Sequence, residues 1–140
     1  MIKEIVTDVE FLEQASEPTT AEDAATAQDL LDTMASIEEG CACLAANQIG
    51  VLKCMVAFEA EDESTHVLYN PKIKQAMRPY KTVEACFSVE KESQVTRYQT
   101  IKVAYQELVD GQLVDRQKKY QGWNAQIIQH GIDHCRGRVI

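Results

Sequence analysis

Apolar side chains recur at helical spacing near the N-terminus of the chain. Ala24, Ala27, Leu31, Met34 and Ile37 follow a spacing of three to four residues, which is typical of a helix with one buried face. Thr20 and Asp23 resemble a capping box, and Gly40 is suited to end a helix. The pattern therefore predicts a helix over residues 21–39.

The middle of the chain has the shorter periodicity of strands. Lys53–Phe58 and His66–Tyr69 are short apolar runs rich in strand formers, and apolar residues alternate with others over 101–105. Asp110-Gly111 is a two-residue hairpin signal, which predicts a return strand near Gln112–Tyr120.

Helical spacing returns at the end of the chain. Trp123, Ile127, His130, Gly131 and His134 fall on or near one helical face, and Gly137 follows them. The order helix, strands, helix favours an α+β fold over an alternating β-α-β fold.

Length and composition place these elements in a single domain, residues 1–140. The net charge of −8 argues against a protein that binds nucleic-acid backbones. No apolar run is long enough for a membrane helix, and the charged N-terminus does not resemble a signal peptide. The chain has five cysteines, an odd number, so we expect a reducing cytoplasm with free thiols.

Two of the three histidines, His130 and His134, are four residues apart. On a helix both imidazoles can reach one metal ion, although the same spacing also occurs in pairs without a metal. A cysteine is the expected third ligand, and spacing alone does not choose between Cys86 and the Cys41/Cys43 pair. Cys54 is expected to be an inert core thiol, and Cys135 points about 100° away from its neighbour His134.

The segment Cys41–Gly50 combines small residues with the amide of Gln48. Small residues allow a ligand to approach the backbone closely, and an amide can donate to a developing oxyanion. A loop that packs small residues under a sheet is the simpler interpretation of the same pattern.

Taken together, three stretches resemble the peptide deformylase family. The family carries G-x-G-L-A-A-x-Q, E-G-C-L-S and Q-H-E-x-D-H in this order. The chain has C-A-C-L-A-A-N-Q at 41–48, E-A-C-F-S at 84–88 and Q-H-G-I-D-H at 129–134. Tyr69-Asn70-Pro71 is also similar to the family's I-N-P strand end.

The resemblance implies antiparallel sheets packed around a central metal-binding helix. It makes Cys86, His130 and His134 the ligands of one divalent metal ion, Fe(II) in the cell with Zn or Ni possible, and a water the fourth ligand. It makes the Gln48 amide and the Phe87 backbone N–H the oxyanion donors. The family's substrate-binding positions correspond to Ala42, Cys43, Leu44, Trp123 and Ile127.

Two carboxylates also match the family. Glu84 corresponds to a structural glutamate, and Asp133 to a carboxylate that orients a ligand or anchors the helix. The implied substrates are N-formylmethionyl peptides, including nascent chains on the ribosome, in the cytoplasm, with no direct nucleic-acid or membrane binding.

Two positions depart from the family pattern. Gly131 stands where the family has its catalytic glutamate, so no general base is expected beside the metal water. Cys43 replaces a glycine and could crowd the substrate. We therefore expect metal binding with very low deformylase activity, or a catalytically silent relative that binds metal and N-terminal peptides. Gly131→Glu is expected to raise activity at least about 10²-fold and to stabilise the helix slightly.

Overall fold

The computed structural model describes residues 1–140, apart from the side chain of Glu90. The elements, in chain order, are α1 (Val9–Leu12), the 3-10 turn η1 (Ala21–Asp23), α2 (Ala24–Ser36), β1 (Cys43–Ala45), the 3-10 turn η2 (Ala46–Ile49), β2 (Met55–Glu59), β3 (Thr65–Cys86), β4 (Val89–Val109), β5 (Gln112–Gln121) and α3 (Gly122–Cys135).

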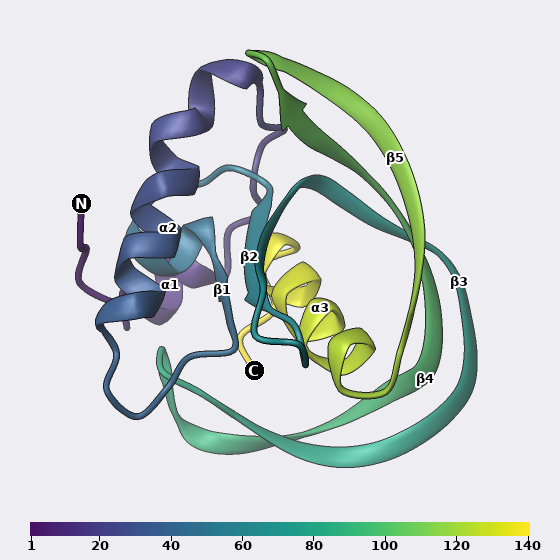
Figure 1. Ribbon diagram of the computed structural model, residues 1–140. Coiled ribbons are helices and arrows are strands. Elements are labelled where there is room, and N and C mark those ends of the chain that lie inside the picture. Colours follow the sequence, from purple (N-terminus) through teal and green to yellow (C-terminus); the bar gives the residue numbers. More distant parts are fainter.

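All five strands form one antiparallel sheet in the order β1-β2-β3-β4-β5. The long strands β3, β4 and β5 curve around α3, while α1 and α2 lie on the other side of β1 and β2 (Figure 1). The predicted α+β class, with antiparallel strands around a C-terminal helix, is confirmed.

The alternation of side chains along β2 separates two cores. Met55 and Ala57 pack with α2 residues such as Leu30. Phe58, on the opposite face of the strand, packs with α3 residues such as Ile128. Because β2 is buried on both faces, its sequence is a continuous apolar run rather than an alternating one.

The strands β3 and β4 are far longer than the sequence predicts. The segment Lys72–Lys81 is mostly exposed and carries no clear alternation, so periodicity does not reveal it as a strand. It is held instead by pairing with β4 in a register that joins Lys72 to Ala104 and Lys81 to Thr96. The hairpin at Asp110-Gly111 lies where it was predicted.

The first predicted helix is correct in place but too long at both ends. The capping box of Thr20 and Asp23 is present, yet it caps a 3-10 turn that leads into α2. The helix ends at Ser36 because Ile37 adopts an extended conformation. Gly40 has a positive φ of 86° and closes the following turn by donating to the Ile37 carbonyl.

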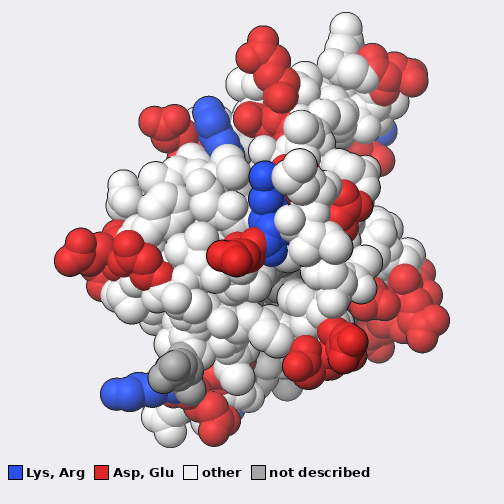
Figure 2. Space-filling model, turned by 90° about the vertical axis from the view of Figure 1, so that its left-hand side faces the viewer, with Lys and Arg blue, Asp and Glu red and all other residues white. Residues whose placement is uncertain are grey.

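No helix in the described part of the chain is long and apolar enough to cross a membrane. On the side that carries α2 and the N-terminus, acidic side chains are spread over the surface with few basic ones among them (Figure 2). On this face, the distribution agrees with the net charge of −8.

Candidate metal centre

Cys86, His130 and His134 converge although they are far apart in the sequence. Cys86 is the last residue of β3, and the two histidines occupy successive turns of α3. The Nε2 atom of His134 lies 3.3 Å from Cys86 Sγ and 3.0 Å from His130 Nε2. Among the described side chains, these form the one group of three or more Cys, His, Asp or Glu residues whose ligand atoms gather closely enough for a metal.

The donor set fits a divalent metal ion. Tetrahedral coordination with metal–nitrogen bonds of about 2.0–2.1 Å and a metal–sulfur bond of about 2.3 Å separates donor atoms by about 3.3–3.6 Å. The distances from His134 Nε2 to Cys86 Sγ and to His130 Nε2 are within a few tenths of an ångström of that spacing. With three protein ligands, a fourth position stays free for water, as in catalytic rather than structural sites.

The cluster is also electrostatically prepared for a cation. Burial opposes ionisation of Cys86, but hydrogen bonds from His130 and His134 outweigh it and lower the pKa of the thiol to about 5. Burial likewise disfavours the charged form of His130, but its bonds to Cys86 and Glu84 raise its pKa to about 9. Without a metal, a thiolate and an imidazolium therefore stabilise each other, and a metal must displace the imidazolium proton.

A carboxylate holds the first histidine in position. Glu84 Oε1 accepts a hydrogen bond of 2.7 Å from His130 Nδ1, which leaves Nε2 directed at the cluster. Burial raises the pKa of Glu84, but hydrogen bonds from His130, Arg97 and Gln126 outweigh it and lower the pKa to about 2. Glu84 therefore has the structural surroundings that the resemblance implies.

Arg97, which sequence reasoning missed, links this carboxylate to the helix. Its guanidinium donates two bonds to Glu84, of 3.0 and 2.8 Å, and one of 2.6 Å to Asp133 Oδ2. Arg97 is only 4% exposed. Nothing in its local sequence distinguishes it from the other charged residues of β4, because only the long β3–β4 pairing brings it beneath the site.

Gln48, from η2, is held in a fixed orientation. Its Oε1 accepts from the Ala45 backbone N–H at 2.9 Å, which turns the NH₂ group toward the metal cluster. That group donates to Cys86 Sγ at 3.1 Å and to Ser88 Oγ at 3.2 Å. The amide is therefore directed at the cluster, where it would be able to donate a hydrogen bond to a developing oxyanion.

A cavity of about 240 Å³ opens beside the cluster. The predicted site residues that line it are Ala42, Cys43, Gln48, Cys86, Phe87, Trp123, Ile127 and His130. Glu84 and Ala85 also line the cavity, together with Val83 and Gln126, which no sequence pattern singled out. His134 is fully buried behind the cavity. The Leu44 side chain packs instead in the core beneath α2, so any contact of Leu44 with a substrate would involve its backbone.

Gly131 lies where α3 packs tightly against Val56 of β2 and Cys43 of β1. A Cβ atom at this position would be 2.5 Å from Val56 Cγ1 and 2.9 Å from Cys43 Sγ. Contacts this short require the side chains of Val56 and Cys43, or the helix itself, to shift. The structure therefore contradicts the expectation that Gly131→Glu by itself stabilises the helix, because helix propensity is smaller than the cost of this overlap.

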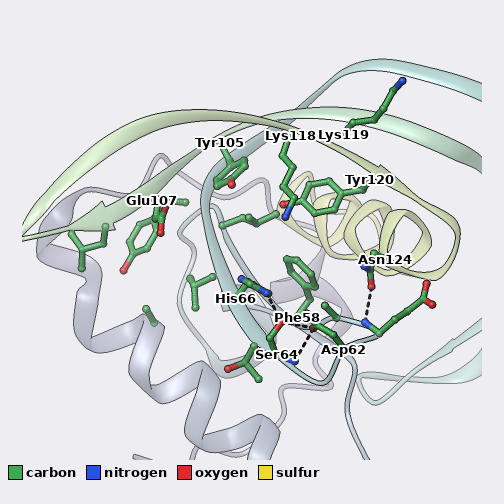
Figure 3. A pocket seen from close by; sticks show the side chains of 18 of the residues that line it. Phe58, Asp62, Ser64, His66, Tyr105, Glu107, Lys118, Lys119, Tyr120 and Asn124 are labelled. Carbon is green, nitrogen blue, oxygen red and sulfur yellow. Dashed lines mark hydrogen bonds between the residues drawn. The ribbon is translucent and has the colours of Figure 1, made fainter.

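A larger hollow, of about 820 Å³, lies away from the metal cluster between β2, β3, β4 and β5 (Figure 3). His66 stacks on Phe58 there, and Ser64 Oγ lies 2.5 Å from Asp62 Oδ1 and 2.7 Å from His66 Nε2. Because the Ser64 hydroxyl is held by the Asp62 carboxylate, it does not have the arrangement of an activated nucleophile.

The fold is α+β, with a curved antiparallel sheet around α3. Beside a small cavity, one cysteine of the sheet and two histidines of α3 form a metal-binding group. Comparison with known families gives the place of this chain among them: the family model described as polypeptide deformylase matches residues 2–140. The peptide deformylase of Clostridium beijerinckii is 39% identical over the whole length of both chains. This chain therefore belongs to the polypeptide deformylase family.

Solved structures agree in fold. A peptide deformylase from Legionella pneumophila superposes with a TM-score of 0.85 at 26% identity, covering 99% of this chain and 83% of its own. The class I type b peptide deformylase from Acinetobacter baumannii, solved with bound Met-Ala-Ser, gives a TM-score of 0.83 at 23% identity, covering 98% and 96%.

Proposed function

We propose that this chain, as one domain over residues 1–140, is a deformylase-type metal hydrolase with a strongly impaired reaction step. Its substrates are N-formylmethionyl peptides, including nascent chains at the ribosome, in the cytoplasm. The observation that carries the proposal is the convergence of Cys86, His130 and His134 beside a cavity into which the Gln48 amide points.

The metal would be held by the Cys86 thiolate and by Nε2 of each histidine. We propose Fe(II) as the ion in the cell, with zinc and nickel able to replace it, since one thiolate and two imidazoles suit all three. When bound, the metal supplies Lewis-acid polarisation of the formyl carbonyl and a water of lowered pKa. Glu84 keeps His130 in the tautomer that presents Nε2.

The cavity suits a methionine side chain. Ala42, Trp123 and Ile127 give it apolar walls of modest volume. The Gln48 amide and the Phe87 backbone N–H would donate to the oxyanion, and one such donor contributes about 3–4 kcal/mol in related reactions. The Met-Ala-Ser peptide bound by the Acinetobacter baumannii deformylase supports the same class of ligand here.

The impairment follows from the missing base. Gly131 has no side chain, and burial raises the pKa of the Cys43 thiol beside it, so this thiol stays protonated. The carboxylates of Glu84 and Asp133 are both engaged by Arg97, and Glu84 is a weak base with a pKa near 2. Losing general acid–base catalysis costs about 10²–10⁴-fold in rate.

The second candidate is a silent relative that binds metal and N-terminal peptides without turnover. Val56 and Cys43 favour it, because they fill the space that a side chain at residue 131 would need. In that case Val56 and Cys43 would occupy the space of the glutamate that the family has at the position of Gly131.

Metal content tests the ligands. We expect Cys86→Ala to remove stoichiometric metal from protein purified anaerobically, whereas the control Cys41→Ala, at a buried cysteine outside the cluster, keeps it. Full metal content in Cys86→Ala would refute the ligand assignment.

Formate release from a formyl-Met-Ala-Ser peptide tests the reaction. We expect the metal-loaded chain to fall at least about 10²-fold below the usual enzyme range of about 1–10³ s⁻¹. Slow release that disappears in Gln48→Ala and Cys86→Ala would support the impaired hydrolase. Release no faster than in Cys86→Ala would favour the silent relative, and a rate within the enzyme range would refute the proposed impairment.

A further inference from the structure

Two cysteines that the metal centre does not use face each other across the contact between α3 and the sheet. Gly131 packs against Val56 of β2. Cys135 lies one helical turn after Gly131, and Cys54 lies two residues before Val56, so both pairs have the same facing arrangement. Because Gly131 has no side chain, the helix lies close to the strand, and this short distance also brings Cys135 close to Cys54.

Direct contacts confirm this arrangement. Cys135 Sγ lies 3.9 Å from the carbonyl oxygen of Met55, the residue after Cys54, and Cys54 and Cys135 pack in one apolar group with Ala45 and Val56. The Ser16 N–H donates to the Cys135 carbonyl at 2.9 Å, and the Cys54 N–H donates to the Glu17 carbonyl at 2.7 Å. One short segment therefore fixes the backbone of both cysteines, and both thiols are free.

The two thiols differ in access. Cys135 is 5% exposed, whereas Cys54 is half-buried and lines a groove of about 690 Å³ together with Lys72 and Lys74. The hydrogen bond from Cys135 lowers the pKa of Cys54, with further help from Lys72 and Arg136, against the effect of burial. Cys54 is therefore half-buried rather than a fully buried core thiol, and it is the more accessible, more acidic member of the pair.

We propose that Cys54 and Cys135 form a redox-active dithiol, which closes to a disulfide when the protein meets a hydroperoxide. The Cys54 thiolate attacks the peroxide, the O–O bond breaks, and an S–O bond forms to give a sulfenic acid and, after protonation, water or an alcohol. The Cys135 thiol then attacks the sulfenic sulfur, the S–S bond forms, and water leaves. In total, two thiols lose two electrons and two protons to the peroxide.

The disulfide would join the last residue of α3, next to His134, to the start of β2. In a reducing compartment such a bond is transient and is reopened by cellular dithiols, which makes it a sensor rather than a structural crosslink. The inference does not rest on the proposed deformylase activity, because neither cysteine belongs to the metal cluster or its cavity.

The test uses nickel-loaded, reduced protein treated with hydrogen peroxide. We expect the number of free thiols under denaturing conditions to fall from five to three, and dithiothreitol to restore five. Trypsin isolates Cys54 in peptide 54–72 and Cys135 in peptide 120–136, each with a single cysteine, so a crosslink between them is identified by its mass.

Matched variants separate the pair from other thiols. Cys54→Ser and Cys135→Ser should both abolish the crosslink, and Cys135→Ser should leave a Cys54 sulfenic acid that dimedone traps. Cys41→Ser, at another buried cysteine, should still form the crosslink. The proposal is overturned if peroxide leaves all five thiols free, or if oxidation falls on peptide 82–91, which carries Cys86, while peptides 54–72 and 120–136 remain unlinked.

Discussion

The two faces of α3 contact the rest of the molecule in different ways. The face that carries His130 and Asp133 is polar, and its groups are joined by hydrogen bonds to Glu84 and Arg97. The face that carries Gly131 packs closely against Val56 of β2 and Cys43 of β1. The polar face keeps the family's pattern and the packed face departs from it, so the proposed metal binding and the proposed loss of proton transfer concern separate parts of one helix.

The largest expected effect comes from removing the ion pairs beneath the polar face of α3. Arg97→Met leaves Glu84 and Asp133 as buried carboxylates without their shared guanidinium, although Asp133 keeps Arg138 at 3.6 Å. We expect a loss of about 3–5 kcal/mol in the free energy of unfolding, measured with urea at pH 7.

The control for this variant is Arg116→Met, which breaks the exposed Arg116–Glu107 pair and should cost less than about 1 kcal/mol. The cost of Arg97→Met should also shrink in acid. Because folding lowers the pKa of Glu84 from 4.5 to about 2, its stabilisation is present above pH 4.5 and is lost as the pH falls toward 2. Equal costs for both variants would contradict the role of Arg97.

The next largest effect is expected when a carboxylate is placed on the packed face of α3 together with the space that it needs. Gly131→Glu combined with Cys43→Gly and Val56→Ala removes the two side chains that occupy the space of a Cβ at residue 131. We expect formate release to rise at least about 10²-fold over the unaltered chain. The control carries Gly131→Gln in the same background, since glutamine has the shape of glutamate but cannot act as a base. A similar gain for both would show that space, rather than the base, limits the rate.

A smaller effect is expected when only a Cβ atom is added at residue 131, between the helix and the strand. Gly131→Ala should destabilise the fold by about 1–3 kcal/mol through overpacking, although alanine is the better helix former by about 1 kcal/mol. In the Val56→Ala background the same substitution should cost less. A double-mutant cycle by urea unfolding measures this coupling, and a stabilising Gly131→Ala would mean that the helix moves away freely.

The smallest expected effect is the number of protons that metal binding releases. With the pKa of Cys86 near 5 and that of His130 near 9, metal binding at pH 7 should release about one proton, from His130. Metal affinity should then rise about tenfold per pH unit between pH 5 and 9. Calorimetry in buffers of different ionisation enthalpy gives the number, and a release of two protons would mean that Cys86 is a neutral thiol before binding.

Sequence patterns gave the fold class, the helical pair of histidines and the Asp110-Gly111 hairpin, since each depends on local spacing. They did not choose Cys86 over Cys41 and Cys43 as the third ligand, and only the family resemblance did so. Arg97 and the facing of Cys54 with Cys135 were missed, because both arise from strand register and helix docking rather than from spacing along the chain.

The position of α3 after all five strands in chain order has a consequence for biosynthesis. Synthesis runs from the N-terminus, and domains fold as the chain emerges. Cys86, Glu84 and Arg97 lie in β3 and β4, whereas both histidines of the proposed metal site and the Asp133 partner of Arg97 lie in α3, which is made after these strands. The three proposed ligands therefore come together only once α3 has been synthesised, so we expect metal loading to follow the synthesis of α3.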